Sequence, residues 1–179
     1  ARTHGRMLSG PDGVTIGASF TRANRGKKSL TVDLKHEEGR ELFLKLVAES
    51  DVVVDNLNPK AMANLGLDFD TLQLANQRVV YLSVTGFGHD DVFQSPYAAW
   101  TAYGPVGEAA AGVSYTRGFK DRAPITSLRL ASGDLPAAYL SGMGLLLALR
   151  QVERTGKAQR VDMAAQSGLG IVANGGDVS

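Results

Sequence analysis

Cysteine is absent from this chain of 179 residues, and histidine is scarce. Without cysteine the chain forms no disulfide framework, no thiolate zinc site and no cysteine nucleophile. The three histidines, His4, His36 and His89, are isolated from one another, so the spacing of a histidine metal site is missing. We therefore expect no bound metal. The lack of cysteine also agrees with a reducing compartment, and we expect a cytoplasmic protein.

The chain also has almost no excess of one sign of charge, because it contains 19 Lys and Arg and 18 Asp and Glu. No global field then attracts nucleic acid or an anionic membrane surface, and neither is expected as a partner. We find no basic-then-apolar leader and no run of about eighteen apolar residues, so no membrane span is expected. Hydrophobic residues make up 44% of the chain and charged residues 21%, which is a globular balance.

Strand-like and helix-like segments alternate along most of the sequence. Runs of apolar and β-branched residues predict four strands, at 29–34, 51–55, 78–84 and 159–163. Helical periodicity and capping residues predict four helices, at 37–49, 59–64, 70–76 and 137–153. This alternation is typical of an α/β fold with a mostly parallel sheet and flanking helices. Residues 1–28 are polar and glycine-rich, which predicts loop with one edge strand within 14–20.

Three segments carry more specific expectations. The valines of 51–55 stand between aspartates, which is typical of a parallel strand buried on both faces. Helix 137–153 is apolar around most of its circumference and should be buried, with Gly142 and Gly144 allowing another backbone to approach. Residues 86–133 are predicted to be irregular apart from a helix within 97–112, and such long stretches are commonly binding loops.

An ordered series of short motifs runs through nearly the whole chain. It consists of NRGKKSLTVDLK at 24–35, EGREL at 38–42, the segment 48–56 ending in VVVDN, LG at 65–66, GFG at 86–88, GD at 133–134, RTGK at 154–157 and QRVD at 159–162. In this order and spacing the chain resembles the class III CoA-transferase family, which includes formyl-CoA transferase, carnitine CoA-transferase and α-methylacyl-CoA racemase. The resemblance implies a Rossmann-like large domain.

Asp134 is the candidate catalytic residue. From its position alone, after a glycine and shortly before Pro136, it reads as the N-cap of the following helix. The resemblance implies instead that its carboxylate attacks an acyl-CoA thioester, giving an aspartyl anhydride and then an aspartyl-CoA thioester. Both interpretations use the same geometry, because the positive end of a helix stabilises a carboxylate as the anion.

Three further residues are candidate contacts to coenzyme A by the same resemblance: Lys35, Asn56 and Leu57. Taken alone, Lys35 is equally well a solvated lysine before a helix, and Asn56 a turn residue. Trp100 and Tyr103 are candidates for lining an acyl pocket, although packing is the default role of aromatic residues. Relatives carry an acidic residue in the segment that matches 96–99, where this chain has Ala98 and Ala99.

The expected function is therefore acyl-CoA:carboxylate CoA transfer, with acyl-CoA and a carboxylic acid as substrates and no permanently bound cofactor. Two alternatives stay open: a non-catalytic CoA-binding subunit or tandem half, suggested by Ala98 and Ala99, and an acyl-CoA racemase or isomerase. The resemblance also implies that residues 1–179 are an incomplete large domain without the family's small domain, and that the full-length protein is an intertwined homodimer.

Overall fold

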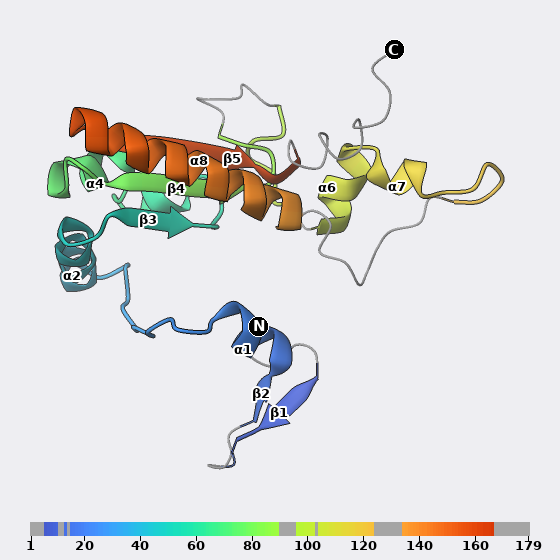
Figure 1. The fold of residues 1–179 in the computed structure, drawn as a ribbon, viewed down its shortest axis with the longest axis horizontal. Coiled ribbons are helices and arrows are strands. Elements are labelled where there is room, and N and C mark those ends of the chain that lie inside the picture. The colour runs from blue at the N-terminus through green and yellow to red at the C-terminus, as the bar shows by residue number, and fades with distance from the viewer. Residues whose placement is uncertain are drawn as a thin grey trace. The chain divides into compact units, whose positions relative to one another are not determined.

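The computed structural model describes residues 6–10, 13, 15–89, 96–102, 104–123 and 134–166 (Figure 1). His4, Tyr103 and Gly133, which the sequence singles out, lie outside these residues. The chain divides into two compact units, residues 1–32 and residues 33–179, and each is described by itself.

The first unit is a small β-hairpin followed by a short helix. Strand β1 (Met7–Ser9) pairs antiparallel with β2 (Thr15–Gly17), and α1 (Ala18–Ala23) follows directly. The turn between the strands is closed by a hydrogen bond from the Gly13 amide to the Gly10 carbonyl, 3.1 Å, with Gly13 at a φ of 75°. The predicted edge strand within 14–20 is confirmed by β2, whereas β1 and α1 were not predicted. A positive φ at glycine makes the tight turn that brings the two short strands together.

Residues 29–34, predicted as a strand, are not one. They have no regular secondary structure up to Asp33, and the side chain of Leu30 is 63% exposed. The composition is right for a strand, but a strand also needs a neighbour to complete its hydrogen bonds, and no described strand pairs with this segment.

The second unit is built on a parallel sheet of three strands in the order β3-β4-β5. The strands are β3 (Val52–Asp55), β4 (Val80–Thr85) and β5 (Gln159–Ala164), which confirms three of the four predicted strands and their parallel pairing. In this register Val53 lies opposite Tyr81, and Ser83 lies opposite Asp162. Strand β3 is not buried on both faces as predicted, because it is an edge strand and the Val54 side chain is 58% exposed.

One face of the sheet is covered by three helices, α2 (Glu37–Ala48), α3 (Ala61–Asn64) and α4 (Phe69–Ala75). The core on this face is made by Val47, Val53, Met62, Leu67, Leu72, Val79 and Tyr81. Gly66 ends the turn after α3 with a φ of 68°, as the sequence predicts. Asp68 then caps α4, since its Oδ1 accepts hydrogen bonds from the Thr71 amide (3.0 Å) and hydroxyl (2.7 Å).

The opposite face is covered by the long helix α8 (Asp134–Thr155), which runs along the sheet (Figure 1). Its residues Ala148 and Val152 pack on Val80, together with partly buried Val161 and three other apolar side chains. A Cβ on Gly144 would lie 3.1 Å from Cγ1 of Val161, which confirms a close approach at this glycine, whereas Gly142 faces open space.

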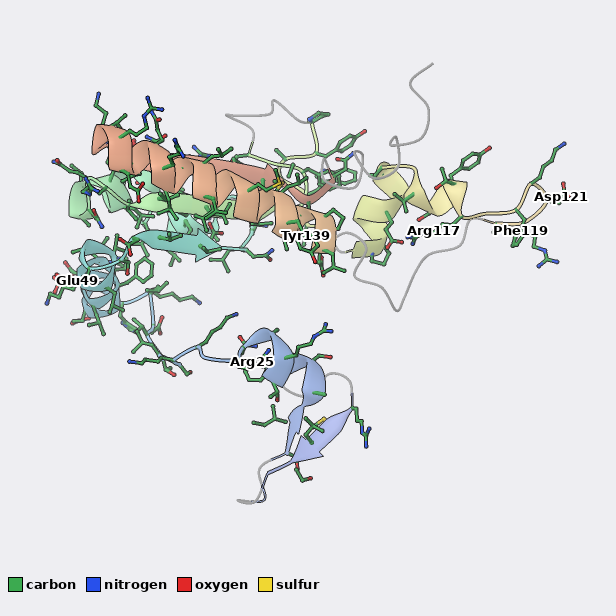
Figure 2. All side chains as sticks on the ribbon, in the orientation of Figure 1. Arg25, Glu49, Arg117, Phe119, Asp121 and Tyr139 are labelled. Atoms are coloured by element: carbon green, nitrogen blue, oxygen red, sulfur yellow. The ribbon has the colours of Figure 1, made fainter. Side chains whose placement is uncertain are left out.

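The prediction that α8 is buried all round is wrong. Its other face is open, with five large apolar side chains exposed by half or more: Leu135, Tyr139, Met143, Leu146 and Leu147. Tyr139 lies near the amino-terminal end of the helix (Figure 2). Amphipathic periodicity cannot reveal how many neighbours a helix has, and only the sheet packs on α8 among the described elements.

By length and composition alone, α8 could also cross a membrane. This corrects the expectation that no segment is apolar enough, but it is weak evidence for a membrane span, since a core helix of a soluble protein passes the same test.

Two further helices, α6 (Gly104–Ala110) and α7 (Val113–Thr116), lie beyond the amino-terminal end of α8 (Figure 1). Helix α6 confirms the predicted helix within 97–112, whereas α7 lies beyond that range in a segment predicted to be irregular. Buried Glu108 of α6 lies 3.9 Å from the guanidinium of Arg117, which follows α7 (Figure 2).

Candidate active site

The carboxyl ends of β3 and β4 and the start of α8 surround a cavity of about 380 Å³. Ligands of open α/β sheets usually bind at this edge, because the loops that follow the strands converge there. Its described lining comprises Asn56, Leu57, Asn58, Pro59, Val84, Thr85, Gly86, Trp100, Thr101, Ala102, Gly104, Asp134 and Ala165. The structure thus brings together three of the four site residues predicted from the sequence: Asp134, Asn56 and Leu57.

Asp134 is the first residue of α8, and its side chain is exposed to the cavity. The helix that follows has 22 residues, so the carboxylate stands where the unpaired backbone amides of the first turn are concentrated. A carboxylate open to a cavity can bond to an electrophile, so the geometry permits the nucleophilic role. The N-cap interpretation stays a prediction.

Asn56 and Leu57 are held at the cavity wall by Asp55, the last residue of β3. The Leu57 amide donates to Oδ1 of Asp55 (3.0 Å), and the Tyr81 hydroxyl donates to Oδ2 (2.6 Å). Burial and the bond to Asp55 raise the pKa of the Tyr81 hydroxyl well above its usual range, so it stays a donor. The sequence analysis missed Asp55 and Tyr81; an aspartate closing an apolar strand was their only signal.

Residues 100–102 form another part of the cavity wall. A Cβ on Gly86 would overlap the Cβ of Ala102, so the glycine at the end of β4 lets this segment approach closely. Aromatic rings extend this contact. The ring centroid of Phe87 lies 5.8 Å from that of Tyr97, and the Tyr97 centroid lies 5.2 Å from that of Trp100. Trp100 therefore lines the cavity as predicted, while Ala98 is buried and Ala99 is exposed.

Thr85, the last residue of β4, also lines this cavity, and the sequence analysis did not select it. The residue is 5% exposed, and its hydroxyl has no hydrogen-bond partner in the part of the chain that is described. An unpaired buried hydroxyl is uncommon, since such groups lose hydration without compensation.

Lys35 is not among the described lining residues of the cavity. It lies in the turn before α2, where its amide donates to Oδ1 of Asp33 (2.9 Å) and its carbonyl accepts from Arg40 (2.9 Å). The side chain is exposed. Its predicted contact with coenzyme A stays a prediction.

A second, apolar cavity of about 550 Å³ follows the free edge of β3 and shares Asn56 and Leu57 with the first. Its other walls come from α2, β3 and Met62. Asn56 and Leu57 therefore line both cavities.

A polar cluster of four residues, Ser83, His89, Arg160 and Asp162, lies outside both cavities. His89 Nε2 lies 3.0 Å from the Ser83 hydroxyl and 3.8 Å from Oδ2 of Asp162, and Arg160 donates to that same oxygen at 3.2 Å. Burial raises the pKa of the Asp162 carboxyl, and the charges of His89 and Arg160 oppose that rise. Among the described residues no group of three or more potential metal ligands occurs.

The model of CoA-transferase family III matches residues 2–173. The chain belongs to this family. It is 37% identical to the succinyl-CoA–L-malate CoA-transferase alpha subunit of Chloroflexus aurantiacus over 139 residues, 78% of this chain and 32% of the relative. It is also 37% identical to the formyl-CoA:oxalate CoA-transferase of Streptomyces coelicolor over 164 residues, 92% of this chain and 38% of the relative.

A solved structure supports the same assignment. The crystal structure of a CaiB/BaiF family protein from Brucella suis matches with a TM-score of 0.84 and 34% identity, over 97% of this chain and 47% of that one. The α/β class and the family resemblance inferred from the sequence are thereby confirmed. The chain spans about a third of the length of the curated relatives it matches.

Proposed function

We propose that this chain carries the nucleophile of an acyl-CoA:carboxylate CoA-transferase, and that the nucleophile is Asp134. The observation that carries the proposal is the exposed carboxylate of Asp134 at the start of α8, in one cavity with Asn56 and Leu57. Family membership supports the reaction class, because the relatives are named as CoA-transferases.

The proposed chemistry divides one exchange into substitution steps at carbonyl carbon. A carboxylate oxygen of Asp134 attacks the thioester carbonyl; the carbon–sulfur bond breaks, and CoA leaves as the thiolate from a mixed anhydride. The thiolate then attacks the aspartyl carbonyl, which releases the first acid as its carboxylate and leaves an aspartyl-CoA thioester. The acceptor carboxylate attacks this thioester and expels the thiolate. Attack of the thiolate on the acceptor's carbonyl in the second anhydride gives the new acyl-CoA and regenerates Asp134.

Coenzyme A is proposed to lie against Asn56 and Leu57. The two cavities meet at these residues, so a long substrate has room on both sides of them. The Asn56 side chain offers a donor and an acceptor, and Leu57, 47% exposed, offers an apolar surface. Lys35 is proposed to hold a CoA phosphate as a point charge, since its side chain is exposed.

We further propose that residues 1–179 are an incomplete large domain, and that the complete protein is a dimer. The supporting observations are the open edge of β3, the open apolar face of α8 and the share of the relatives that the chain spans. An exposed apolar face of this kind supports the proposal, because such surfaces are commonly interaction sites.

Asp134→Asn in the complete protein tests the catalytic proposal. The amide keeps the shape of the side chain and removes its nucleophilic oxygen, so kcat for acyl exchange should fall by at least about 10³-fold. CoA binding, measured by calorimetry, should persist. The matched control is Asp121→Asn, an exposed aspartate in the loop after α7 (Figure 2), which should leave kcat unchanged. Full activity of Asp134→Asn would remove the proposal.

A second candidate function is a non-catalytic CoA-binding subunit. The resemblance implies an acidic residue in the segment that matches 96–99, where this chain has Ala98 and Ala99. One similar protein is named as an alpha subunit. This function predicts CoA binding without exchange, and exchange only after a partner chain is added. The Asp134→Asn comparison separates the two, because a non-catalytic subunit would support the same rate with either residue.

A further inference from the structure

The chain turns back on the sheet directly after β4. Residues 86–89 follow the carboxyl end of this strand, and Gly88, with a φ of 81°, allows the reversal. The side chain of His89 then returns to the sheet, where its Nε2 lies 3.0 Å from the hydroxyl of Ser83 in β4 itself. Ser83 is buried and the His89 side chain is 15% exposed, so water competes little for this contact.

The neighbouring strand supplies a second anchor for His89. Asp162 of β5 lies opposite Ser83 in the sheet register, and its Oδ2 is 3.8 Å from the same Nε2. Arg160 donates to that oxygen at 3.2 Å, which marks the oxygen as an acceptor. A proton on Nε2 suits both the hydroxyl and the carboxylate that face it. His89 thereby joins the turn after β4 to two strands of the sheet.

The same turn forms part of the candidate active-site cavity. Gly86 lines the cavity, and its carbonyl accepts a hydrogen bond from the Gln166 amide (3.1 Å). Residues 100–102 lie directly on Gly86, because a Cβ there would overlap the Cβ of Ala102. A displacement of the turn would therefore reach Trp100, which lines the cavity and is 60% exposed.

We propose that His89 is a positioning residue for coenzyme A: the proton on its Nε2 holds the turn after β4, and with it the cavity wall that carries Trp100. The inference rests on the proposed placement of coenzyme A in this cavity and adds a residue outside its described lining. His89 does for the turn after β4 what Asp55 does for the turn after β3. With both turns held in advance, less order has to be gained on binding, which favours affinity.

His89→Gln and His89→Asn form a matched pair for the test. Glutamine can place its amide nitrogen close to the position of Nε2 and keeps a neutral donor there, whereas asparagine is one methylene shorter and does not reach. The dissociation constant of CoA for the complete protein is measured by calorimetry. We expect it to rise at least about 10-fold in His89→Asn, since ordering one or two side chains on binding costs about that factor, and to stay within about 3-fold in His89→Gln.

The same titration separates positioning from folding. A variant that merely folds less well offers fewer binding sites per chain at an unchanged dissociation constant. That result in His89→Asn, or a dissociation constant equal to that of the parent protein, would overturn the inference. Equal weakening in both variants would also overturn it, because the donor that His89→Gln retains would then have no effect.

Ser83→Ala tests the same contact from its other partner, and it decides the question if His89→Asn does not fold. The change removes one oxygen atom and leaves the Nε2 proton of His89 without its nearer acceptor. The dissociation constant of CoA should rise by at least about 3-fold, because a buried donor that loses its partner no longer fixes the turn. An unchanged dissociation constant in Ser83→Ala would contradict the inference.

The outcomes distinguish this inference from the proposed function. Asp134→Asn is expected to keep CoA binding, so a failure of the nucleophile leaves the test of His89 intact. If the complete protein does not bind CoA, the proposed placement of CoA fails and the role of His89 fails with it. If the parent protein and His89→Asn bind CoA equally well, the role of His89 alone is overturned.

Discussion

At the scale of single residues, the site depends on side chains that position the candidate contact residues but take no part in the proposed reaction. Asp55 is the clearest case, because its two oxygens join the Leu57 backbone to the Tyr81 hydroxyl across two neighbouring strands. This pair fixes the path of the chain directly after β3, where Asn56 and Leu57 face the cavity.

Tyr81→Phe should destabilise the complete protein by about 1–3 kcal/mol, because it leaves a buried carboxylate oxygen of Asp55 without its donor. The free energy of unfolding, measured by urea denaturation, checks this. The matched control is Tyr115→Phe, since Tyr115 is 81% exposed and its loss should stay within about 0.5 kcal/mol. Equal stability of the two variants would show that the Asp55–Tyr81 bond does not hold the end of β3.

The candidate residues Asp134, Asn56 and Leu57 could be predicted from the sequence because motif order places them at the ends of a strand and at the start of a helix. Their supporting partners could not. Asp55 meets Tyr81 only through the register of two strands, and Gly86 meets Ala102 only through the packing of a loop on β4. Such contacts join residues far apart in the chain and leave no local pattern.

At the scale of elements, the strands and helices that the sequence predicts correctly are those with local signals. The valine run of β3 and the apolar run of β4 each contain enough information by themselves. The failures, strand 29–34 and the burial of α8, depend on which neighbour each element has, and that is decided by tertiary packing.

The cap of α4 gives a pH-dependent prediction. The bonds from the Thr71 amide and hydroxyl lower the pKa of the Asp68 carboxyl below its ordinary value of 3.8. A lowered pKa means that the stabilisation is fully present above the pKa of the unfolded chain and is lost as the pH falls through the lowered pKa. Asp68→Ala should therefore cost about 1 kcal/mol at neutral pH, and less as the solution is acidified.

Urea denaturation across a pH series measures this difference. Asp70→Ala is the control within the same first turn of α4, because Asp70 is exposed and interacts with the helix dipole without capping it. It should cost only a few tenths of a kcal/mol. A cost for Asp68→Ala that stays constant down to low pH would contradict the capping role of the ionised carboxylate.

The contact between β4 and residues 100–102 gives a prediction about the cavity wall. Gly86→Ala places a Cβ on top of the Cβ of Ala102, so the wall must move, and exchange activity should fall by about 10²-fold, as expected for a misplaced site. Gly142→Ala is the control, since a Cβ there meets nothing within 4 Å and the residue is not among the described lining residues of the cavity. Exchange kinetics of the complete protein separate the two, and equal rates would show that the wall adapts freely.

At the scale of the whole molecule, the three-stranded sheet buries both faces under helices but leaves several apolar surfaces open. Two of these among the described residues are the edge of β3 and the outer face of α8. Helices cover both sides of the parallel sheet, and five of the six residues of its central strand β4 are buried. The cavity that contains the candidate nucleophile lies at the carboxyl edge of this well-packed centre.

A covalent adduct on Asp134 is the most direct measure of the central claim. The complete protein is mixed with acyl-CoA, quenched with hydroxylamine and digested, and the peptide that contains Asp134 is analysed by mass spectrometry. Hydroxylamine converts an aspartyl anhydride or thioester into a hydroxamate, so the account predicts that mass shift on Asp134 and none in Asp134→Asn. Rapid acyl exchange with an unmodified Asp134, or with the adduct on another residue, would contradict it.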